Sequence, residues 1–223
     1  MAKFYGVGVG PGDRKLLTLK AVEILNKVDV VLAPSKGEGS IAYFIAKPYI
    51  KGEVVFLDFP MTYDTKRLKD KWEENAEKIR ELLMGGKDVA FITIGDPMIY
   101  STYIYLLREL EGFEIETIPG ISSYSAAAAS FNLPIAEGRQ NFAVVSSDDP
   151  EEIEKILELF DTVVLMKVSR NYDTIIKLLK DKGFVGNLAI KCGHEDEKKT
   201  RNLEEFIGKK LDYLSLIIAK KEK

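Results

Sequence analysis

Asp96, which stands in a glycine-proline turn, is the side chain in this sequence best suited to ligand chemistry. The residues before it, 89–93, are apolar or β-branched without interruption, which is typical of a strand buried on both faces of a parallel sheet. Gly95 and Pro97 end that strand, because glycine is conformationally free and proline has no N–H to donate. Open α/β sheets bind ligands beyond the carboxyl ends of their strands. The turn is therefore a candidate site, in which Asp96 either makes a local turn hydrogen bond or accepts from ligand hydroxyls.

A second turn that is suited to a ligand follows the first predicted strand, where glycine occupies positions 6, 8, 10 and 12. The dinucleotide pattern G-x-G-x-x-G fails in both registers, since Pro11 and Asp13 stand at the third glycine position, and no P-loop pattern occurs. The alternative is a tight strand-to-helix connection without a ligand. Because both turns follow strands of a predicted parallel sheet, we expect them to share one edge and one binding crevice.

The only cysteine and the only histidine, Cys192 and His194, are two residues apart. They are too few to complete a zinc ligand set, so we expect no metal site, and a Cys-His nucleophilic pair would need a particular spatial arrangement. We expect a loop after a strand here. The acidic residues 195–197 and the pair Lys198 and Lys199 are expected to be solvated loop, and Trp72 to be core.

Strands and helices alternate along the whole chain, which predicts an α/β fold. In the first half we expect strands at 3–10, 28–33, 53–58, 88–93 and 114–118, and helices that include 17–28, 41–49, 68–83 and 99–110. Pro34 is expected to end the second strand. In the second half we expect strands at 141–146, 162–167, 187–192 and 213–219, and helices at 150–160 and 171–182 after a small-residue helix that begins near 121. The break at Pro119 and Gly120 places a domain boundary between residues 1–118 and 119–223.

Length and composition exclude several classes of protein. The chain has 223 residues, 46% hydrophobic and 30% charged, with a formal net charge of −3. An acidic chain of this kind carries no general footprint for nucleic acid or for an anionic membrane. No apolar run approaches a membrane span and no signal peptide is evident, so we expect a cytoplasmic protein. A single cysteine excludes an internal disulfide.

Four motifs in order and spacing resemble those of the tetrapyrrole methylases: GVGVGPGD with LLTLKA (residues 6–13 and 16–21), IGDP (94–97), YST (100–102) and IPGISS (118–123). Within that superfamily, FPMT (59–62) and the helix with Trp72 resemble the C-20 methyltransferases of cobalamin synthesis. The resemblance implies two α/β domains with a cleft between them, a bound S-adenosylmethionine and a homodimer. It assigns cofactor contacts to Pro11, Ile94, Gly95, Asp96, Ile99, Ser122, Ser123, Met166 and Gly193.

The activity that the resemblance implies is methyl transfer to carbon 20 of precorrin-2 or cobalt-factor II, without a nucleic-acid or membrane partner. Catalysis would be mostly positioning, because the donor is already activated, and no general base stands out. Candidate contacts for the acceptor and its carboxylates are Lys36, Met61, Tyr63, Arg67, Arg139, Lys167 and Arg170, and the alternative for the charged ones is solvated surface. Two other functions stay open: another methylase of this fold, acting at a different tetrapyrrole position, on RNA or on a protein side chain, and a nucleotide-binding module without chemistry.

Overall fold

The computed structural model describes residues 2–35, 39–60 and 64–222. The chain divides into two compact units, Met1–Ser122 and Ser123–Lys223, and each unit contains its own five-stranded sheet. The predicted α/β architecture is confirmed. The boundary drawn from the sequence, after residue 118, lies at the end of the last strand of the first unit.

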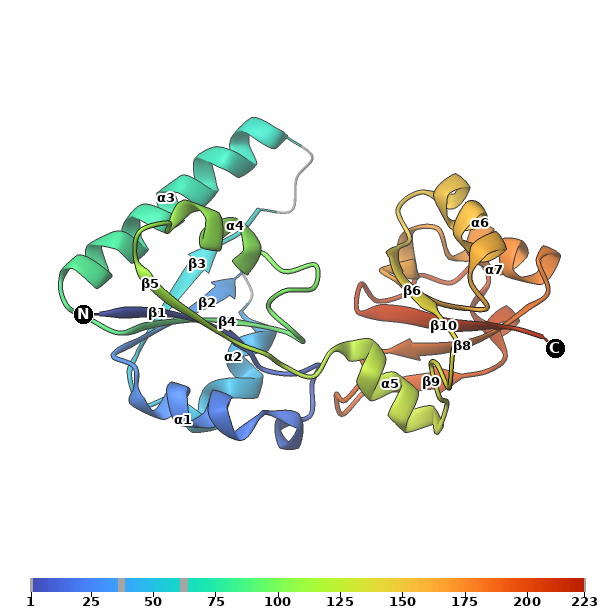
Figure 1. Ribbon diagram of the computed structural model, residues 1–223, viewed down its shortest axis with the longest axis horizontal. Coiled ribbons are helices and arrows are strands. Elements are labelled where there is room, and N and C mark those ends of the chain that lie inside the picture. The colour runs from blue at the N-terminus through green and yellow to red at the C-terminus, as the bar shows by residue number, and fades with distance from the viewer. Residues whose placement is uncertain (1, 36–38, 61–63, 223) are drawn as a thin grey trace. The chain divides into compact units, whose positions relative to one another are not determined.

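The sheet of the first unit is entirely parallel (Figure 1). Its strands stand in the order β3-β2-β4-β1-β5. Their bounds are Lys3–Gly8 for β1, Val30–Ser35 for β2, Glu53–Asp58 for β3, Val89–Thr93 for β4 and Glu114–Ile118 for β5. β1 and β4 are neighbours, paired from Phe4 with Val89 to Gly8 with Thr93. Because all five strands are parallel, their carboxyl ends meet at one edge of the sheet.

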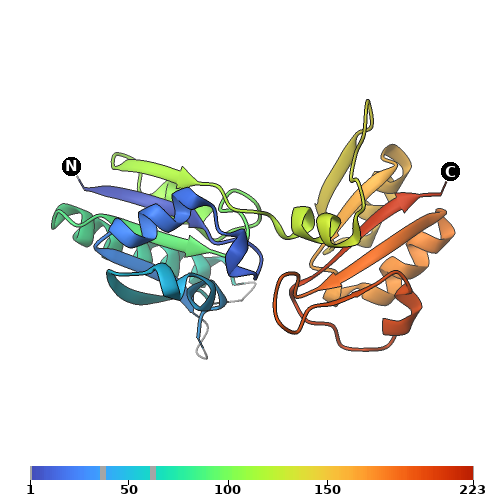
Figure 2. The same cartoon turned by 90° about the horizontal axis from the view of Figure 1, so that it is seen from below.

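Helices cover both faces of this sheet, as Figures 1 and 2 show. One face carries α1 (Leu19–Lys27) and α2 (Ile41–Ala46), and the other carries α3 (Thr65–Met84) and α4 (Tyr103–Glu109). All of β4 is buried as a result, which is the reason for its unbroken apolar sequence. Short 3₁₀ turns occur at Arg14–Leu16 and Lys47–Tyr49.

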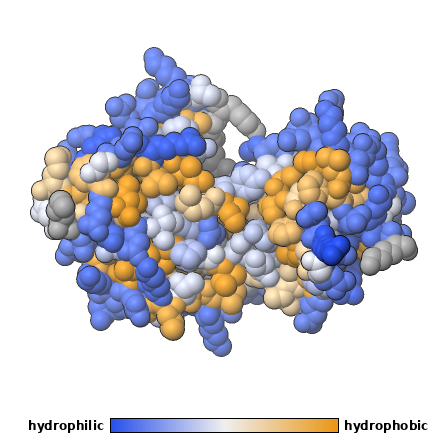
Figure 3. Space-filling view, viewed as in Figure 1, coloured by the Kyte–Doolittle hydropathy of each residue, from blue (hydrophilic) through white to orange (hydrophobic). Residues whose placement is uncertain are grey.

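The long helix α3 has the amphipathic character that its sequence predicts. Ala76, Ile79 and Leu83 are buried against the sheet, whereas the outward side is hydrophilic (Figure 3). Trp72 is partly buried and packs against the core, so the expectation that it is core holds only in part. Its indole stacks on the ring of Tyr105 of α4 with the centroids 3.9 Å apart. No helix in the described ranges combines the length and the apolar character that a bilayer crossing needs.

Several boundaries in the first unit differ from the prediction: β1 ends at Gly8 and not at residue 10, and β2 begins at Val30 and not at residue 28. α4 begins at Tyr103 and not near Ile99, because Tyr100 adopts a left-handed conformation with a φ of 51°. The Ser101 hydroxyl then accepts from the Tyr103 N–H at 3.2 Å and donates to Thr93 Oγ1 at 3.0 Å. β2 runs through Pro34 to Ser35. Its pairing with β4 stops at Leu32, so Pro34 has a strand neighbour on one side only, where proline is tolerated.

The second unit has a mixed sheet in the order β6-β7-β10-β8-β9. β10 is antiparallel to both of its neighbours, whereas β6 and β7 are parallel. The strand bounds are Phe142–Ser146 for β6, Thr162–Met166 for β7, Phe184–Ile190 for β8, Lys198–Thr200 for β9 and Ser215–Lys221 for β10. The prediction of a solvated loop at Lys198 and Lys199 was wrong, since these residues form the edge strand β9. The lysine side chains of an edge strand stay in water, so their sequence pattern resembles that of a solvated loop.

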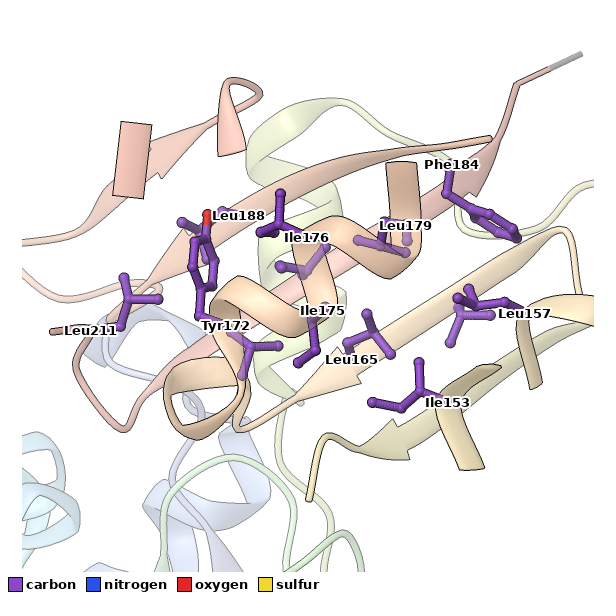
Figure 4. Close-up of a cluster of buried hydrophobic side chains, with 14 of the residues drawn as sticks. Ile153, Leu157, Leu165, Tyr172, Ile175, Ile176, Leu179, Phe184, Leu188 and Leu211 are labelled. Carbon is purple, nitrogen blue, oxygen red and sulfur yellow. The ribbon is translucent and has the colours of Figure 1, made fainter. Parts of the chain in front are cut away.

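Three helices and two 3₁₀ turns complete the second unit. α5 (Ser123–Phe131) packs on one face of the sheet, and α6 (Pro150–Leu159) and α7 (Tyr172–Asp181) pack on the other. Figure 4 shows side chains of α6 and α7 turned toward Leu165 of β7 and Leu188 of β8. Asp149 caps α6 through the N–H groups of residues 151 and 152, as its sequence predicts. The 3₁₀ turns are Val168–Arg170 and Leu203–Phe206.

Glycine at position 6 is needed for packing and not for a ligand. A methyl group there would lie well inside van der Waals contact with the ring of Tyr103. That ring is fully buried, and its hydroxyl shares a 2.7 Å hydrogen bond with the hydroxyl of Thr117 on β5. The ring of Tyr103, the first residue of α4, therefore occupies the space that Gly6 leaves beside β1.

We expect Gly6→Ala to destabilise the protein by about 2–3 kcal/mol, because an extra methyl in a packed core forces neighbours to move. Urea unfolding followed by fluorescence measures the change. Combining Gly6→Ala with Tyr103→Leu should cost clearly less than the sum of the two single changes, since the smaller side chain makes room. Strict additivity would show that the ring is not what the glycine accommodates.

Candidate functional site at the carboxyl edges of the two sheets

The two turns singled out in the sequence lie side by side in the first unit. Gly10, after β1, and Gly95, after β4, form an antiparallel bridge. The Gly95 N–H donates to the Gly10 carbonyl at 2.8 Å, and the Gly10 N–H donates to the Gly95 carbonyl at 3.3 Å. The expectation that both turns share one sheet edge is therefore confirmed.

A third turn, Pro119 and Gly120 after β5, joins the first two through backbone contact. A Cβ atom added at Gly8 would stand 2.6 Å from both the Gly120 nitrogen and the Gly95 oxygen. A Cβ atom added at Gly120 would collide with the Gly95 carbonyl oxygen. Three strand ends are thus packed backbone to backbone, and side chains at these glycines would separate them.

The carboxylate of Asp96 ties these turns together. Its Oδ1 accepts from the Met98 N–H at 2.9 Å, within its own turn, and its Oδ2 accepts from the Gly120 N–H at 3.0 Å, across the edge. Both oxygens of the carboxylate therefore hold backbone donors. The arrangement is suited to fixing the shape of the turns and not to proton transfer, although each oxygen retains a second lone pair for a ligand donor.

The other predicted cofactor residues of the first unit lie in or beside the three turns, and Ser123 begins the second unit. Pro11 is buried directly after Gly10, and Ile94 precedes Gly95. Ile99 donates its N–H to the Asp96 carbonyl at 3.4 Å. Ser122 follows Gly120 by two residues and ends the first unit, and Ser123 begins α5.

The second unit brings Met166 and Gly193 to one edge of its own sheet. Met166 ends β7 and is paired with Ser146, the last residue of β6. β8 runs parallel to β7, because both are antiparallel to β10, and it ends at Ile190, three residues before Gly193. The Gly193 N–H donates to Glu197 Oε2 at 3.0 Å. These two predicted positions, far apart in sequence, therefore lie at the same edge of the sheet, beyond the carboxyl ends of two parallel strands that β10 separates.

Cys192 is unsuited to nucleophilic catalysis. Its thiol is buried, and burial, with a smaller effect from the nearby Glu197 carboxylate, raises the thiol pKa to about 11. The thiol is therefore protonated at neutral pH, and only the thiolate is a good nucleophile. Within the described ranges, no three His, Cys, Asp or Glu side chains are placed to hold a metal ion.

The candidate acceptor contacts that the structure describes are divided between the two units and, within the second, between two edges of its sheet. Lys36, Met61 and Tyr63 lie outside the described residues. Arg67 is in the first turn of α3 beside a hollow of about 400 Å³, where the described lining residues include four acidic and three basic side chains. Lys167, with a φ of 60°, follows Met166, and Arg170 pairs with Asp148 at 3.2 Å. Arg139 precedes the amino end of β6 and so lies at the opposite edge of that sheet.

A cationic hollow at the end of β8 was missed in the sequence. It has a volume of about 360 Å³ and is lined by Lys191, Lys198, Lys210, Asp196, Asp212, Ile190, Phe206 and Leu211. Lys191 pairs with both aspartates, at 2.7 and 3.5 Å, whereas Lys198 and Lys210 form no ion pair with any described residue. The only sequence signal was two lysine doublets, at 198–199 and 209–210, separated by nine other residues. Pairing of β9 with β8 sets Lys198 opposite Ile190, and Lys210 lines the hollow from the segment between the last 3₁₀ turn and β10.

Four buried side-chain atoms in the described part of the chain have no hydrogen-bond partner: Asn75 Oδ1, Ser147 Oγ, His194 Nε2 and Glu197 Oε1. Each residue is close to the carboxyl end of a strand. Asn75 donates its amide to the carbonyl of Asp58, where β3 ends, Ser147 follows β6, and His194 and Glu197 follow β8. Buried polar groups are normally paired, so these unsatisfied atoms make the carboxyl edges candidate ligand sites.

Full-length relatives and solved structures resemble this chain. A probable cobalt-precorrin-2 C(20)-methyltransferase of Methanocaldococcus jannaschii is 42% identical over 99% of this chain and 97% of that protein. A cobalt-precorrin-2 C(20)-methyltransferase of Salmonella typhimurium is 35% identical over the same shares. A precorrin-2 C(20)-methyltransferase of a Sinorhizobium species is 28% identical over 98% of this chain and 95% of that protein.

Among solved structures, a cobalt precorrin-4 methyltransferase has a TM-score of 0.77 at 21% identity, covering 98% of this chain and 94% of that one. A uroporphyrin-III C-methyltransferase of Thermus thermophilus, in complex with S-adenosylhomocysteine, has a TM-score of 0.69 at 22% identity, covering 98% of this chain and 97% of that one. At these identities the likeness establishes the fold.

We expect Asp96→Asn to destabilise the protein by about 1–3 kcal/mol, because an amide has one acceptor oxygen where two N–H groups need one each. Thermal and urea unfolding measure the loss. The control is Asp13→Asn, because Asp13 accepts from one N–H only, that of Lys15 at 2.9 Å, and an amide oxygen can replace it. Equal stability of the two variants would contradict the bridging role.

The family comparison covers both units. The family described as Tetrapyrrole (Corrin/Porphyrin) Methylases matches residues 3–205. That range holds the three glycine turns, Asp96 with its two backbone donors, and the edge that carries Met166 and Gly193. The chain belongs to the tetrapyrrole methylase family.

Proposed function

We propose that this protein is an S-adenosylmethionine-dependent methyltransferase that methylates carbon 20 of cobalt-precorrin-2 in cobalamin biosynthesis. The observation that carries the proposal is the identity of 42% and 35% to full-length relatives of that name. The relative named for precorrin-2 without cobalt is 28% identical. This ranking favours a cobalt-containing acceptor.

The residues at the two carboxyl edges fit a donor of this kind. S-Adenosylmethionine presents hydroxyl, amino and carboxylate groups, and small-residue turns expose the backbone groups that hydrogen-bond with them. The buried unpaired atoms of Ser147, His194 and Glu197 add side-chain partners. We propose cofactor contacts at Pro11, Ile94, Gly95, Asp96, Ile99, Ser122, Ser123, Met166 and Gly193.

When bound, S-adenosylmethionine supplies a methyl group that its sulfonium has already activated. The task of the chain is therefore to position the two reactants and exclude water. Asp96 contributes by fixing the β4 turn against the β5 turn through the Met98 and Gly120 N–H groups. No side chain needs to act as a nucleophile, in agreement with a protonated Cys192. A homodimer, which the family resemblance implies, stays a prediction.

The acceptor carries several carboxylates, which favours a local group of cations. Of the two hollows, the one beside Arg67 has more acidic than basic residues among its described lining. The one at the end of β8 has three lysines against two aspartates. We propose that Lys198 and Lys210, which have no ion pair among the described residues, hold acceptor carboxylates.

Offered labelled S-adenosylmethionine under anaerobic conditions, the purified protein is expected to place one methyl group on cobalt-precorrin-2. Parallel reactions contain precorrin-2, uroporphyrinogen III and bulk RNA, and mass spectrometry identifies the product. S-Adenosylhomocysteine should also raise the melting temperature, because it binds the folded state. Label on uroporphyrinogen III or RNA alone would overturn the choice of acceptor, and a melting shift with ATP or NAD in its place would overturn the cofactor.

Replacing Lys198 or Lys210 by alanine should raise the KM for the acceptor about fivefold each, the effect of losing roughly 1 kcal/mol from an exposed ion pair. The KM for S-adenosylmethionine should not change. Added salt should reduce the difference from the unsubstituted protein, because exposed charges are screened. Lys155→Ala, which changes another exposed lysine on α6, is the matched control. An acceptor KM equal to that of this control would show that Lys198 and Lys210 do not bind the acceptor.

A further inference from the structure

The loop after β8 contains a carboxylate that is only half satisfied. Glu197 Oε2 accepts from the Gly193 N–H at 3.0 Å. The other oxygen, Oε1, is buried and has no partner among the described residues. A buried acceptor without a donor costs free energy, and an ionised one costs more. The fold therefore holds a carboxylate oxygen in place without supplying a donor for it.

The position of Glu197 connects it to the predicted cofactor residues of the second unit. Cys192 and Met166 both belong to the cluster that packs under α5, and the Glu197 carboxylate is close enough to Cys192 to contribute to the raised pKa of its thiol. Gly193 is bound to Glu197 directly. The open oxygen thus belongs to the same edge, on the α5 side, as Met166 and Gly193.

A second unsatisfied atom on this loop points to the same kind of partner. His194 Nε2 is also buried without a partner in the described structure. The backbone of the loop is itself fixed, because the His194 N–H donates to Lys191 and the Glu197 N–H donates to His194, at 3.0 and 3.1 Å. A rigid loop with two unused hydrogen-bonding atoms is preorganised for a polar ligand.

We infer that Glu197 accepts a hydrogen bond from the adenosyl part of the cofactor, from a ribose hydroxyl or from the adenine amino group. The inference rests on the proposed function. A carboxylate has only acceptor capacity, which matches these donors, and an acidic side chain binds ribose hydroxyls in other nucleotide sites. Glu197 is then a binding and specificity residue that takes no part in methyl transfer.

The test uses Glu197→Gln in the full chain, with Glu195→Gln as the matched control. A glutamine at position 197 can still accept from the Gly193 N–H, but it turns an NH₂ group toward the ligand donor. Glu195 is exposed and has no hydrogen bond or ion pair with the described residues. Calorimetric titration with S-adenosylhomocysteine should show binding at least about tenfold weaker for Glu197→Gln and unchanged binding for Glu195→Gln.

Melting without ligand separates ligand binding from a structural role. Replacing a side-chain oxygen that is buried without a partner should leave the melting temperature of ligand-free Glu197→Gln equal or higher, while the shift caused by S-adenosylhomocysteine becomes smaller. A lower ligand-free melting temperature with unchanged affinity would overturn the inference, because Glu197 would then be a structural residue, with water as the partner of Oε1.

Analogues identify the donor. S-Adenosylhomocysteine analogues that lack the 2′-hydroxyl, lack the 3′-hydroxyl or carry an N6-dimethylated adenine are titrated into the unsubstituted protein and into Glu197→Gln. The analogue that lacks the donor should bind the unsubstituted protein more weakly than S-adenosylhomocysteine does. It should bind Glu197→Gln as well as S-adenosylhomocysteine does, because the interaction is already lost there. Additive losses for all three would overturn the inference. Absence of binding to the unsubstituted protein would instead refute the proposed function.

Discussion

The first unit depends on backbone contact between three strand ends. The turns after β1, β4 and β5 approach so closely that neither Gly8 nor Gly120 has space for a side chain. Such contact leaves the polar groups of the turns short of solvent, and Asp96 compensates by accepting from two of their N–H groups. Moving the carboxylate would separate the turns, and separating them would leave the carboxylate without its donors. The shape of the edge therefore follows from the two hydrogen bonds of the Asp96 side chain and from a few glycines.

The carboxyl edge of the second unit is built differently. Its strand ends are held by ordinary sheet pairing, with Met166 beside Ser146 on one side and β8 beside β10 on the other. The side chains of Ser147, His194 and Glu197 keep unpaired atoms there. Protein stability alone does not favour such groups, since each buried unpaired atom costs free energy. Binding sites commonly retain groups of this kind because a ligand, and not the fold, completes them.

A protein with a negative net charge needs a local group of cations to bind a ligand with several carboxylates. The net charge of −3 gives no general attraction for anions, so specificity has to come from local cations. Lys191 pairs with Asp196 and Asp212, and Lys198 and Lys210 bring the lining of that hollow to three lysines against two aspartates, an excess of one positive charge. The Arg170 guanidinium is likewise paired with Asp148, and an ion pair fixes a guanidinium more than it strengthens its field.

The sequence by itself determined the elements and the first edge. Apolar runs located the strands of the first sheet, and the order of strand and turn placed Gly95 and Asp96 at a carboxyl end, because period and punctuation are local properties. Tertiary structure decided what depends on distant neighbours. It placed Tyr103 against Gly6 and turned Lys198 and Lys199 into an edge strand. It also gave Asp96 its donor at Gly120 and left Glu197 with an unpaired oxygen. Each of these facts depends on residues brought together by chain folding, and no local pattern contains them.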